Sequence, residues 1–211
     1  MTAAALIPAL LEARSLCFLR QDEPVFGPID FALHAGEIAL VEGDNGSGKT
    51  TLMRVLTGML RAGEGEVLLD GAPFSLDTVA GAVVFLGHHL GLKFDLSPRE
   101  NLDLAAGLYG MRDGASTSAV LREVGLGGYE DEPVRQLSAG QKKRVALARL
   151  LLLPARVWLL DEPYANLDRE GIALVNHLLE QHAARGGAAL VTSHGAVTFA
   201  GDALRRIRLH A

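Results

Sequence analysis

Short apolar runs separated by glycine-rich and polar segments set the pattern of this chain, which has 211 residues. Three such runs, residues 10–16, 31–33 and 66–69, are bounded by polar and turn residues, among them Asp70 and Gly71. Runs of this length between turns predict short strands. We therefore expect a small antiparallel sheet in the first third of the chain.

A second group of apolar runs predicts a different sheet. Residues 38–41, 157–160 and 188–191 are continuously apolar, which is typical of strands buried on both faces of a parallel sheet. The first of these runs leads into a glycine-rich loop and then into a helical pattern over residues 49–60. A strand, a glycine-rich loop and a helix in this order are typical of phosphate binding.

The middle of the chain, residues 90–136, predicts an inserted helical segment. Ser97 and Glu100 have the spacing of a capping box, with Pro98 at the first helical position, and helix-favouring residues follow. Residues 125–133 are rich in glycine and polar residues, so we expect a loop that returns the chain to the main sheet.

The glycine-rich loop satisfies the pattern G-x-x-x-x-G-K-[ST]. Its residues are Gly43, Asp44, Asn45, Gly46, Ser47, Gly48, Lys49 and Thr50. Glycines let backbone N–H groups point at phosphate oxygens, and the helix N-terminus adds partial positive charge. We expect Lys49 to hold the β- and γ-phosphates of a nucleotide, Thr50 to bind Mg²⁺, and Thr51 to add a hydroxyl near the phosphates.

Two adjacent carboxylates, Asp161 and Glu162, follow the apolar run at 157–160. The carboxyl edge of an open α/β sheet is where such proteins bind ligands. Alone, this pair could be a solvated strand end; together with the phosphate loop it predicts that Asp161 supports Mg²⁺ and that Glu162 orients or deprotonates the attacking water. We expect Trp158, which has apolar neighbours, to belong to the core.

His194 follows a second apolar run after Thr192 and Ser193. Its imidazole is expected at the same sheet edge as Asp161, where it would sense the γ-phosphate. Further back, Ser138 and Gln141 have the spacing of a capping box at the start of a helical run that ends near residue 153. By itself this is a well-capped helix.

Charge and composition limit the kinds of partner and the cellular location that we expect for this chain. The formal net charge is −5, which argues against nucleic acid as a main partner. The basic cluster at residues 142–144 is interpreted as a solvated face. The longest apolar stretch is shorter than the roughly 20 residues of a membrane-spanning helix, and no signal peptide is evident near Met1, so we expect a cytosolic chain. Cys17, the single cysteine, is expected in the core.

These motifs, in this order, resemble those of ABC ATPases. The resemblance rests on the loop at residues 43–50, the signature at 137–141, Asp161 with Glu162, the segment at 165–168, and His194. It implies an α/β P-loop fold, the ABC-type nucleotide-binding domain, with a mixed core sheet, a small antiparallel β subdomain and an inserted helical subdomain. The whole chain, 1–211, would be one domain, in which residues 90–136 form the helical part between about 1–89 and 137–211.

The resemblance also implies how the site is completed. In that family two domains pair head to tail, and the signature of one completes the ATP site of the other. Ser138, Gly140 and Gln141 would then contact ATP across a dimer interface. Asp168 would couple the two sites. The implied ligands are ATP and Mg²⁺.

One segment narrows the resemblance. Residues 86–93 carry His88 where most ABC ATPases carry glutamine, and a neutral imidazole can still approach a metal-bound water, so His88 is a candidate catalytic residue. This segment, the signature helix and the short length resemble the ATP-binding subunits of cytochrome c maturation exporters. The resemblance implies integral membrane partners of the CcmB-like and CcmC-like types, a haem chaperone, and a peripheral position on the cytoplasmic face of the bacterial inner membrane.

Several alternatives remain at this point. The motifs that hydrolyse ATP do not encode cargo, so the ATPase of a lipoprotein or drug exporter is a second interpretation. A soluble ABC protein acting on ribosomes or DNA usually has two ATPase domains or long coiled arms, which this chain lacks. A module that holds ATP without hydrolysis is disfavoured by Glu162. For the adenine-stacking residue the candidate is Phe18, for which core packing is an equal alternative.

Overall fold

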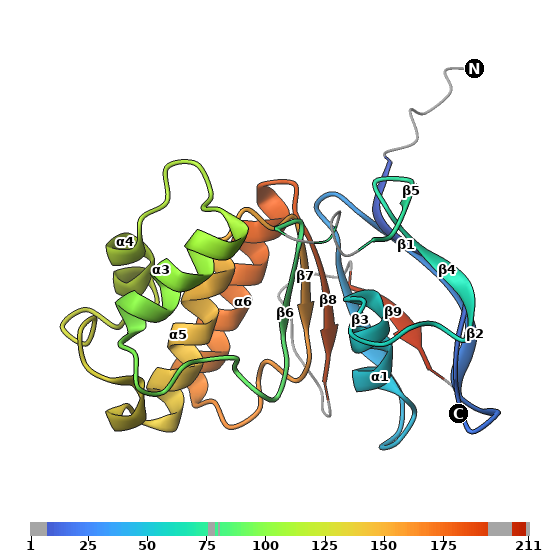
Figure 1. Cartoon of the computed structure of the whole chain (residues 1–211), viewed down its shortest axis with the longest axis horizontal. Coiled ribbons are helices and arrows are strands. Elements are labelled where there is room, and N and C mark those ends of the chain that lie inside the picture. The colour runs from blue at the N-terminus through green and yellow to red at the C-terminus, as the bar shows by residue number, and fades with distance from the viewer. Residues whose placement is uncertain (1–7, 76–78, 80, 194–203, 210–211) are drawn as a thin grey trace.

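The computed structural model describes residues 8–75, 79, 81–193 and 204–209. It consists of a parallel sheet in the middle, a layer of helices on one side, and a helix and a second, antiparallel sheet on the other (Figure 1). None of the helices in the described ranges is long and apolar enough to cross a bilayer.

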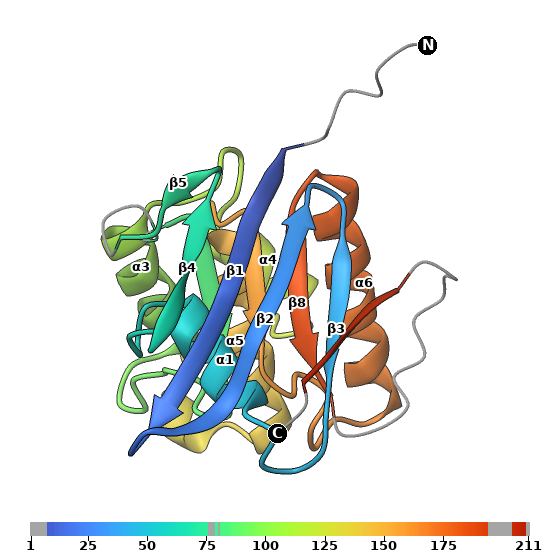
Figure 2. The same cartoon turned by 90° about the vertical axis from the view of Figure 1, so that its right-hand side faces the viewer.

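The antiparallel sheet contains four strands in the order β2-β1-β4-β5. Their bounds are Ala9–Arg20 (β1), Glu23–His34 (β2), Glu64–Leu69 (β4) and Ala72–Pro73 (β5). The predicted antiparallel strands are confirmed, but β1 and β2 are each longer than their apolar runs. The reason is that their register shifts at bulges and polar residues occupy the exposed face, so hydrophobicity marks only part of each strand. Figure 2 shows this long hairpin crossing the molecule in front of α1.

The central sheet contains five strands in the order β6-β7-β8-β3-β9. They are Ile38–Glu42 (β3), Val83–Leu86 (β6), Val157–Leu160 (β7), Ala188–Thr192 (β8) and Arg205–Arg208 (β9). The sheet expected to be mixed is parallel in all four pairings that the described residues make. Neighbouring strands are joined by long crossover connections, whereas the antiparallel hairpins form their own sheet.

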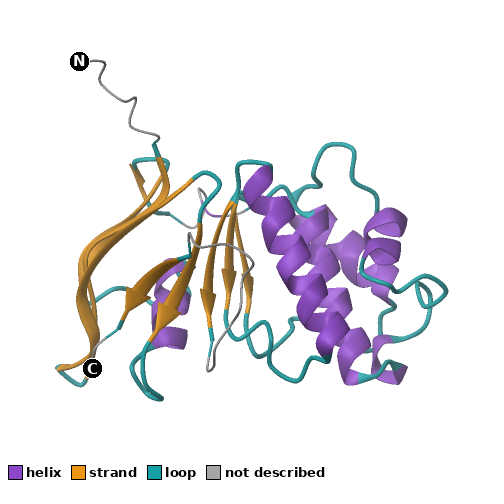
Figure 3. Cartoon of the chain, turned by 180° about the vertical axis from the view of Figure 1, so that it is seen from behind, coloured by secondary structure: helices purple, strands orange, loops and turns teal. Residues whose placement is uncertain are grey.

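Helices cover both faces of the parallel sheet. They are Lys49–Leu56 (α1), Pro98–Tyr109 (α3), Thr117–Glu123 (α4), Ala139–Leu152 (α5) and Arg169–Ala184 (α6), with a 3₁₀ turn at Val134–Gln136. Helices α3 to α6 lie together on one side, whereas α1 lies between the two sheets (Figures 1 and 3). The helical insert predicted for residues 90–136 thus contains α3 and α4, and both pack on α5.

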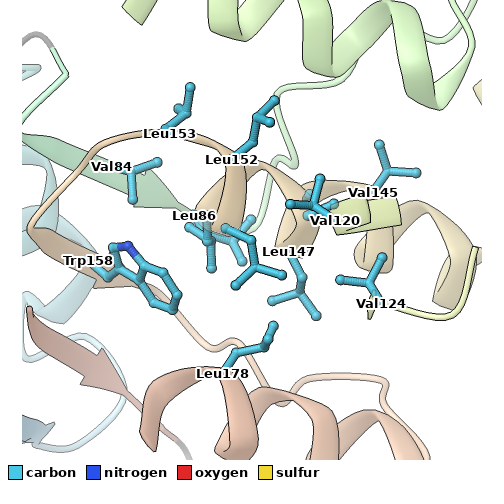
Figure 4. Close-up of a cluster of buried hydrophobic side chains, with 14 of the residues drawn as sticks. Val84, Leu86, Val120, Val124, Val145, Leu147, Leu152, Leu153, Trp158 and Leu178 are labelled. Carbon is cyan, nitrogen blue, oxygen red and sulfur yellow. The ribbon is translucent and has the colours of Figure 1, made fainter. Parts of the chain in front are cut away.

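The residues of β7 show how the parallel sheet divides the core. Trp158 and Leu160 face the cluster under α3 to α6, whereas Val157 and Leu159 face the cluster around α1 and the antiparallel sheet. All four side chains are buried, which explains the continuously apolar run. Figure 4 shows Trp158 among side chains of the first cluster, so its predicted place in the core is confirmed. Cys17 is also buried.

A histidine joins α6 to this core. The His182 ring stacks on Trp158 with 3.9 Å between ring centroids and 10° between ring planes. Its Nε2 lies 3.1 Å from the carbonyl oxygen of Arg156, and its side chain is 3% exposed. Burial lowers the pKa of His182 from 6.5 to about 4, so the ring is neutral near pH 7.

Helix boundaries follow their caps. Ser97 and Glu100 form the predicted capping box at the start of α3, and Ser138 and Gln141 form one at α5. Helix α1 ends at Leu56, four residues before the predicted end, because the chain turns at Gly58, which has a φ of 74°. A left-handed glycine at this position ends a helix by bonding its last carbonyl groups.

Candidate functional site

Four strands of the parallel sheet, β3, β6, β7 and β8, end at the same edge because they run in the same direction. The residues that follow the four strand ends are Gly43, Gly87, Asp161 and Ser193. This edge is the expected ligand site of an open α/β sheet. The phosphate loop and the acidic pair therefore lie together as predicted, although 110 residues separate them.

The phosphate loop ends directly in α1. Gly48 is the N-cap of this helix with a φ of 90°, and no side chain caps the helix. The first backbone N–H groups of α1 therefore remain available to an anion. Lys49 is 6% exposed, and its ammonium group donates to the carbonyl oxygens of Gly43 at 2.7 Å and Asp44 at 2.9 Å. This holds the cation over the loop.

The start of the loop leaves no room for a side chain. A Cβ added to Gly43 would overlap Ser47 Oγ and lie 2.9 Å from the carbonyl oxygen of Leu209. Ser47 Oγ is buried and has no hydrogen-bond partner among the described residues. A buried hydroxyl without a partner, next to the uncapped start of α1, matches the chemistry of a phosphate site.

A chain of hydrogen bonds links the loop to the acidic pair. Thr50 Oγ1 donates to Asp161 Oδ2 at 2.8 Å, and Thr192 Oγ1 donates to Asp161 Oδ1 at 2.7 Å. The backbone N–H of Glu162 donates to Thr192 Oγ1 at 2.9 Å. Asp161 is 5% exposed and Thr192 is fully buried. Three elements, α1, β7 and β8, thus fix the position of one carboxylate.

Glu162 turns out of the line of β7. Its φ is 52°, a left-handed conformation that L residues rarely adopt and that often marks functional sites. Lys143 of α5 approaches the same residue, with Nζ 3.5 Å from the Glu162 carbonyl oxygen. Burial lowers the pKa of Lys143, and the carboxylates of Glu162 and Asp161 partly offset this effect.

Two cavities meet at this edge and share Thr50 and Glu162. One, which we call the phosphate cavity, has a volume of about 1290 Å³ and is lined by the loop, by Arg20 and Val25 of the hairpin, and by Arg208. The other, the α3 cavity, has a volume of about 890 Å³ and lies between β6, α3 and the end of α1. Asp161 lines the α3 cavity.

The structure describes one of the two predicted catalytic histidines, His88, but not the other, His194. His88 is exposed just after the end of β6 and lines the α3 cavity, beside His89 at 5.7 Å between ring centroids. It therefore lies at the cavity that also contains Glu162. His194 lies outside the described residues, so its expected role stays a prediction.

The signature residues do not join the loop of the same chain. Ser138 is exposed, and neither it nor Gly140 nor Gln141 lines the phosphate cavity. Asp168 is exposed as well and caps α6, with its Oδ1 accepting from the backbone N–H of Gly171 at 2.7 Å. A single chain thus brings together the loop, Asp161 and Glu162, but not the signature or Asp168.

The site suits a divalent cation only with help from a ligand. Within the described ranges, no group of three or more His, Cys, Asp or Glu side chains could hold a metal ion. Thr50 Oγ1 and Asp161 supply a hydroxyl and a carboxylate side by side. Mg²⁺ is typically bound by one or two protein oxygens, several waters and substrate phosphates, so this pair matches a nucleotide-borne metal.

Two residues of the site were missed at the level of sequence. Thr192 bridges Asp161 and Glu162, and its signal was its place at the end of a buried run, one strand from β7. Lys143 was interpreted as part of a solvated face, which is wrong: it is 9% exposed. A run of three cations does not reveal which one points inward, since that depends on the packing of α5.

Together, the fold, the loop that ends in Lys49 and the buried aspartate on a neighbouring strand define a P-loop ATPase. Comparison with known proteins agrees. Residues 26–165 match the family model described as ABC transporter. A cytochrome c biogenesis ATP-binding export protein, CcmA, from Xanthomonas campestris is 58% identical over 189 residues, which cover 90% of this chain and 88% of that protein.

Solved structures show the same fold. An ABC transporter ATP-binding protein from Pyrococcus furiosus is 26% identical with a TM-score of 0.79, covering 95% of this chain and 97% of that one. A dimeric ATP-binding cassette bound to ADP and phosphate is 22% identical with a TM-score of 0.76, covering 88% of each chain. The chain belongs to the ABC transporter family, within the group of CcmA cytochrome c biogenesis ATP-binding export proteins. It is an ATP-binding ATPase subunit.

Proposed function

We propose that this chain hydrolyses Mg²⁺-bound ATP at the edge where the phosphate cavity and the α3 cavity meet. The observation that carries the proposal is the hydrogen-bonded chain from Thr50 through Asp161 and Thr192 to Glu162. It ties the phosphate loop to the Asp161 carboxylate and to the backbone of Glu162. Bound Mg²⁺ would neutralise charge on the β- and γ-phosphates.

Each residue then has one task. The backbone N–H groups of residues 46–50 and the Lys49 ammonium group bind the phosphates. Thr50 and Asp161 hold the metal, and Thr192 keeps the Asp161 carboxylate in place. Glu162, which lines both cavities together with Thr50, accepts a proton from the attacking water. His88 and His194 are proposed to orient the water and contact the γ-phosphate.

We further propose that two chains pair head to tail. The exposed capping box of Ser138 leaves the first two N–H groups of α5 without a side-chain acceptor, and Gly140 has open space around it. These groups can approach the phosphates bound to a second chain. Gln141 and Asp168 would lie at the same interface.

We propose that this ATPase binds an integral membrane subunit of the CcmB-like type, with CcmC-like and haem-chaperone components in the same complex. The cytoplasmic segment of that subunit would dock in the α3 cavity. Some large apolar side chains that line this cavity are also exposed at the surface. They include Leu108 of α3, 67% exposed, and Met59, 63% exposed. Because the α3 cavity shares Thr50 and Glu162 with the phosphate cavity, a docked segment is placed to report on the nucleotide.

Charge specifies the chemistry of that docked segment. Arg149 of α5 lines the α3 cavity, its Nε is buried without a partner among the described residues, and its contacts with the carbonyl oxygens of Gly91 and Phe85 are long, 3.4 Å each. Burial lowers the pKa of Arg149. A half-buried cation that has no carboxylate partner among the described residues favours a ligand that supplies one, so we propose an apolar segment with an acidic residue.

A matched pair of variants tests this docking. Leu108→Asp introduces charge at the α3 cavity, whereas Met111→Asp does so at a residue of similar type, 49% exposed, that does not line it. We expect L108D to abolish co-purification with the membrane subunit and M111D to retain it, with ATP binding equal in both. Equal loss in both variants would remove the α3 cavity as the docking site.

The biological task is proposed to be a step of c-type cytochrome maturation, either haem delivery or release of a haem-loaded chaperone, carried out at the cytoplasmic face of the inner membrane. The experiment is deletion of the gene, followed by staining of membrane and periplasmic fractions for covalent haem. We expect loss of stained cytochromes, restored by the wild-type gene but not by Glu162→Gln. Unchanged staining would contradict this task, and it would leave the ATPase itself intact.

A further inference from the structure

The purine of a bound nucleotide needs a surface beyond the phosphate loop, and no aromatic ring provides it. Among the described residues that line the phosphate cavity, none is Phe, Tyr, Trp or His. Phe18, the expected stacking residue, is not one of them, and its ring lies 6.4 Å from that of Phe26, between centroids, against the core. The base must therefore contact another kind of side chain.

Arg20 extends the phosphate cavity away from the loop. It ends β1 and pairs with Glu23 across a two-residue turn, in which Gln21 and Asp22 have φ values of 53° and 65°. Two positive φ angles are typical of the tight turn that matches the twist of a hairpin. The tip of the hairpin, and Arg20 with it, is thus held in a defined position.

The hairpin lies directly on the start of α1. A Cβ added to Gly48 would come within 3.0 Å of the carbonyl oxygen of Val25 and 3.2 Å of the Phe26 side chain. Val25 also lines the phosphate cavity. The side chains of Arg20 and Val25 therefore border the space next to the phosphates, where the sugar and base of a nucleotide would extend.

We propose that Arg20 stacks its guanidinium group on the nucleotide base, with Val25 packed against the base edge. This inference rests on the proposed nucleotide site. The Arg20 side chain is exposed, and no hydrogen bond or ion pair engages it within the described part of the chain. A planar guanidinium stacks on aromatic rings through dispersion and cation–π attraction, as arginine does with bases in nucleic-acid sites.

Arg208 provides a matched comparison. It lines the same cavity and is exposed too, but it comes from β9, opposite Glu42 in the parallel pairing. Arg208 therefore adds positive charge to the cavity without belonging to the hairpin. If charge alone explained the contribution of Arg20, the two arginines would contribute alike.

The test measures binding of ATP and of inorganic tripolyphosphate, which lacks a base, by titration calorimetry. For Arg20→Ala we expect ATP affinity to fall about ten-fold, with tripolyphosphate affinity within about three-fold of wild type. For Arg208→Ala we expect equal, small losses for both ligands. Equal losses of ATP and tripolyphosphate in R20A, or ATP binding unchanged in it, would overturn the proposal.

Two replacements at the same position separate shape from charge. Arg20→Tyr restores a flat surface without charge and should keep ATP affinity within about three-fold of wild type, whereas Arg20→Lys should resemble R20A. The reverse order would contradict stacking. Lys49→Ala serves as the reference for the site itself: if it binds both ligands like wild type, the proposed nucleotide site fails, and this outcome is distinct from any result at Arg20.

Discussion

Two helix N-termini, those of α1 and α5, are built in opposite ways. Helix α1 begins at Gly48, in a left-handed conformation and without a side-chain cap. Helix α5 begins at Ser138, whose hydroxyl and the Gln141 side chain close a complete capping box. An uncapped end needs an outside acceptor for its N–H groups, whereas a boxed end is stable by itself. Helix α1 thus has a start that needs a ligand, whereas helix α5 has a start that is closed by its own side chains and exposed.

The same contrast applies to the surroundings of the two ends. Gly48 lies against Val25 and Phe26, so the start of α1 is enclosed. Gly140, two residues after Ser138, has nothing within 4 Å of an added Cβ. The start of α1 is therefore covered by its own chain, whereas the start of α5 is open, as the proposed head-to-tail dimer requires.

The largest effect is expected when the two glycines are exchanged for alanine in separate variants. Gly48→Ala forces a side chain into a left-handed φ of 90° against the Val25 carbonyl oxygen, which should cost about 1–3 kcal/mol of unfolding free energy and abolish ATP binding. Gly140→Ala should leave stability equal or raise it by up to about 1 kcal/mol, leave ATP binding intact, and abolish hydrolysis.

We would test these expectations by measuring thermal unfolding, ATP binding and phosphate release for both variants. Loss of ATP binding in Gly140→Ala would mean that α5 contributes to the site of its own chain. Full hydrolysis in the same variant would mean that the signature is not used at all. Either result breaks the comparison.

A second, smaller effect concerns the link between the Asp161 carboxylate and the backbone of Glu162. Thr192→Val removes the hydroxyl that joins Asp161 to the backbone of Glu162 while keeping the shape of the side chain. We expect kcat to fall roughly 10- to 100-fold, with ATP affinity within a few-fold of wild type, and stability to fall by about 1–3 kcal/mol. Thr117→Val, at the start of α4, removes a hydroxyl that donates to the Asp103 carboxylate and lines neither cavity, so it is the control and should leave kcat unchanged.

The smallest effect in neutral solution is the pH dependence that His182 introduces. Its pKa is about 4 in the folded chain and near 6.5 when unfolded, so the unfolded state binds the proton first. Stability from this group is therefore complete above about pH 6.5 and lost as pH falls toward 4, on the order of 3 kcal/mol in all. Denaturant unfolding of wild type and His182→Phe across this range should show a shallower acid loss in the variant; equal slopes would contradict the assignment.

How far the sequence predicts this molecule depends on whether a residue's role is local. The loop at residues 43–50, the two capping boxes and the buried strand before Asp161 follow from spacing and periodicity, because neighbouring residues decide them. The stacking of His182 on Trp158 and the burial of Lys143 do not, because they depend on how α6 and α5 pack on the sheet. The role of Thr192 does not follow from the sequence either, because it depends on the pairing of β8 with β7.

The roles of the hairpin residues also depend on packing rather than on local sequence. The sequence makes Phe18 the candidate for an aromatic stacking residue, with core packing as the alternative, and the structure places it against the core with Phe26. Arg20, two residues later at the end of β1, lines the phosphate cavity. An exposed arginine before a polar turn has no distinctive sequence pattern. Its place beside the loop follows only from the packing of Val25 and Phe26 of β2 on Gly48.

In the proposed dimer, the exposed start of α5 completes the ATP site of a second chain. The most direct measurement is the molar mass of Glu162→Gln by light scattering, with and without ATP. We predict a single chain of 22.4 kDa without ATP and twice that mass with ATP, because the variant binds nucleotide but does not hydrolyse it. Adding Ser138→Arg should return it to one chain with ATP still bound. A variant that hydrolyses ATP normally, or a dimer that persists with Ser138→Arg, would contradict the account.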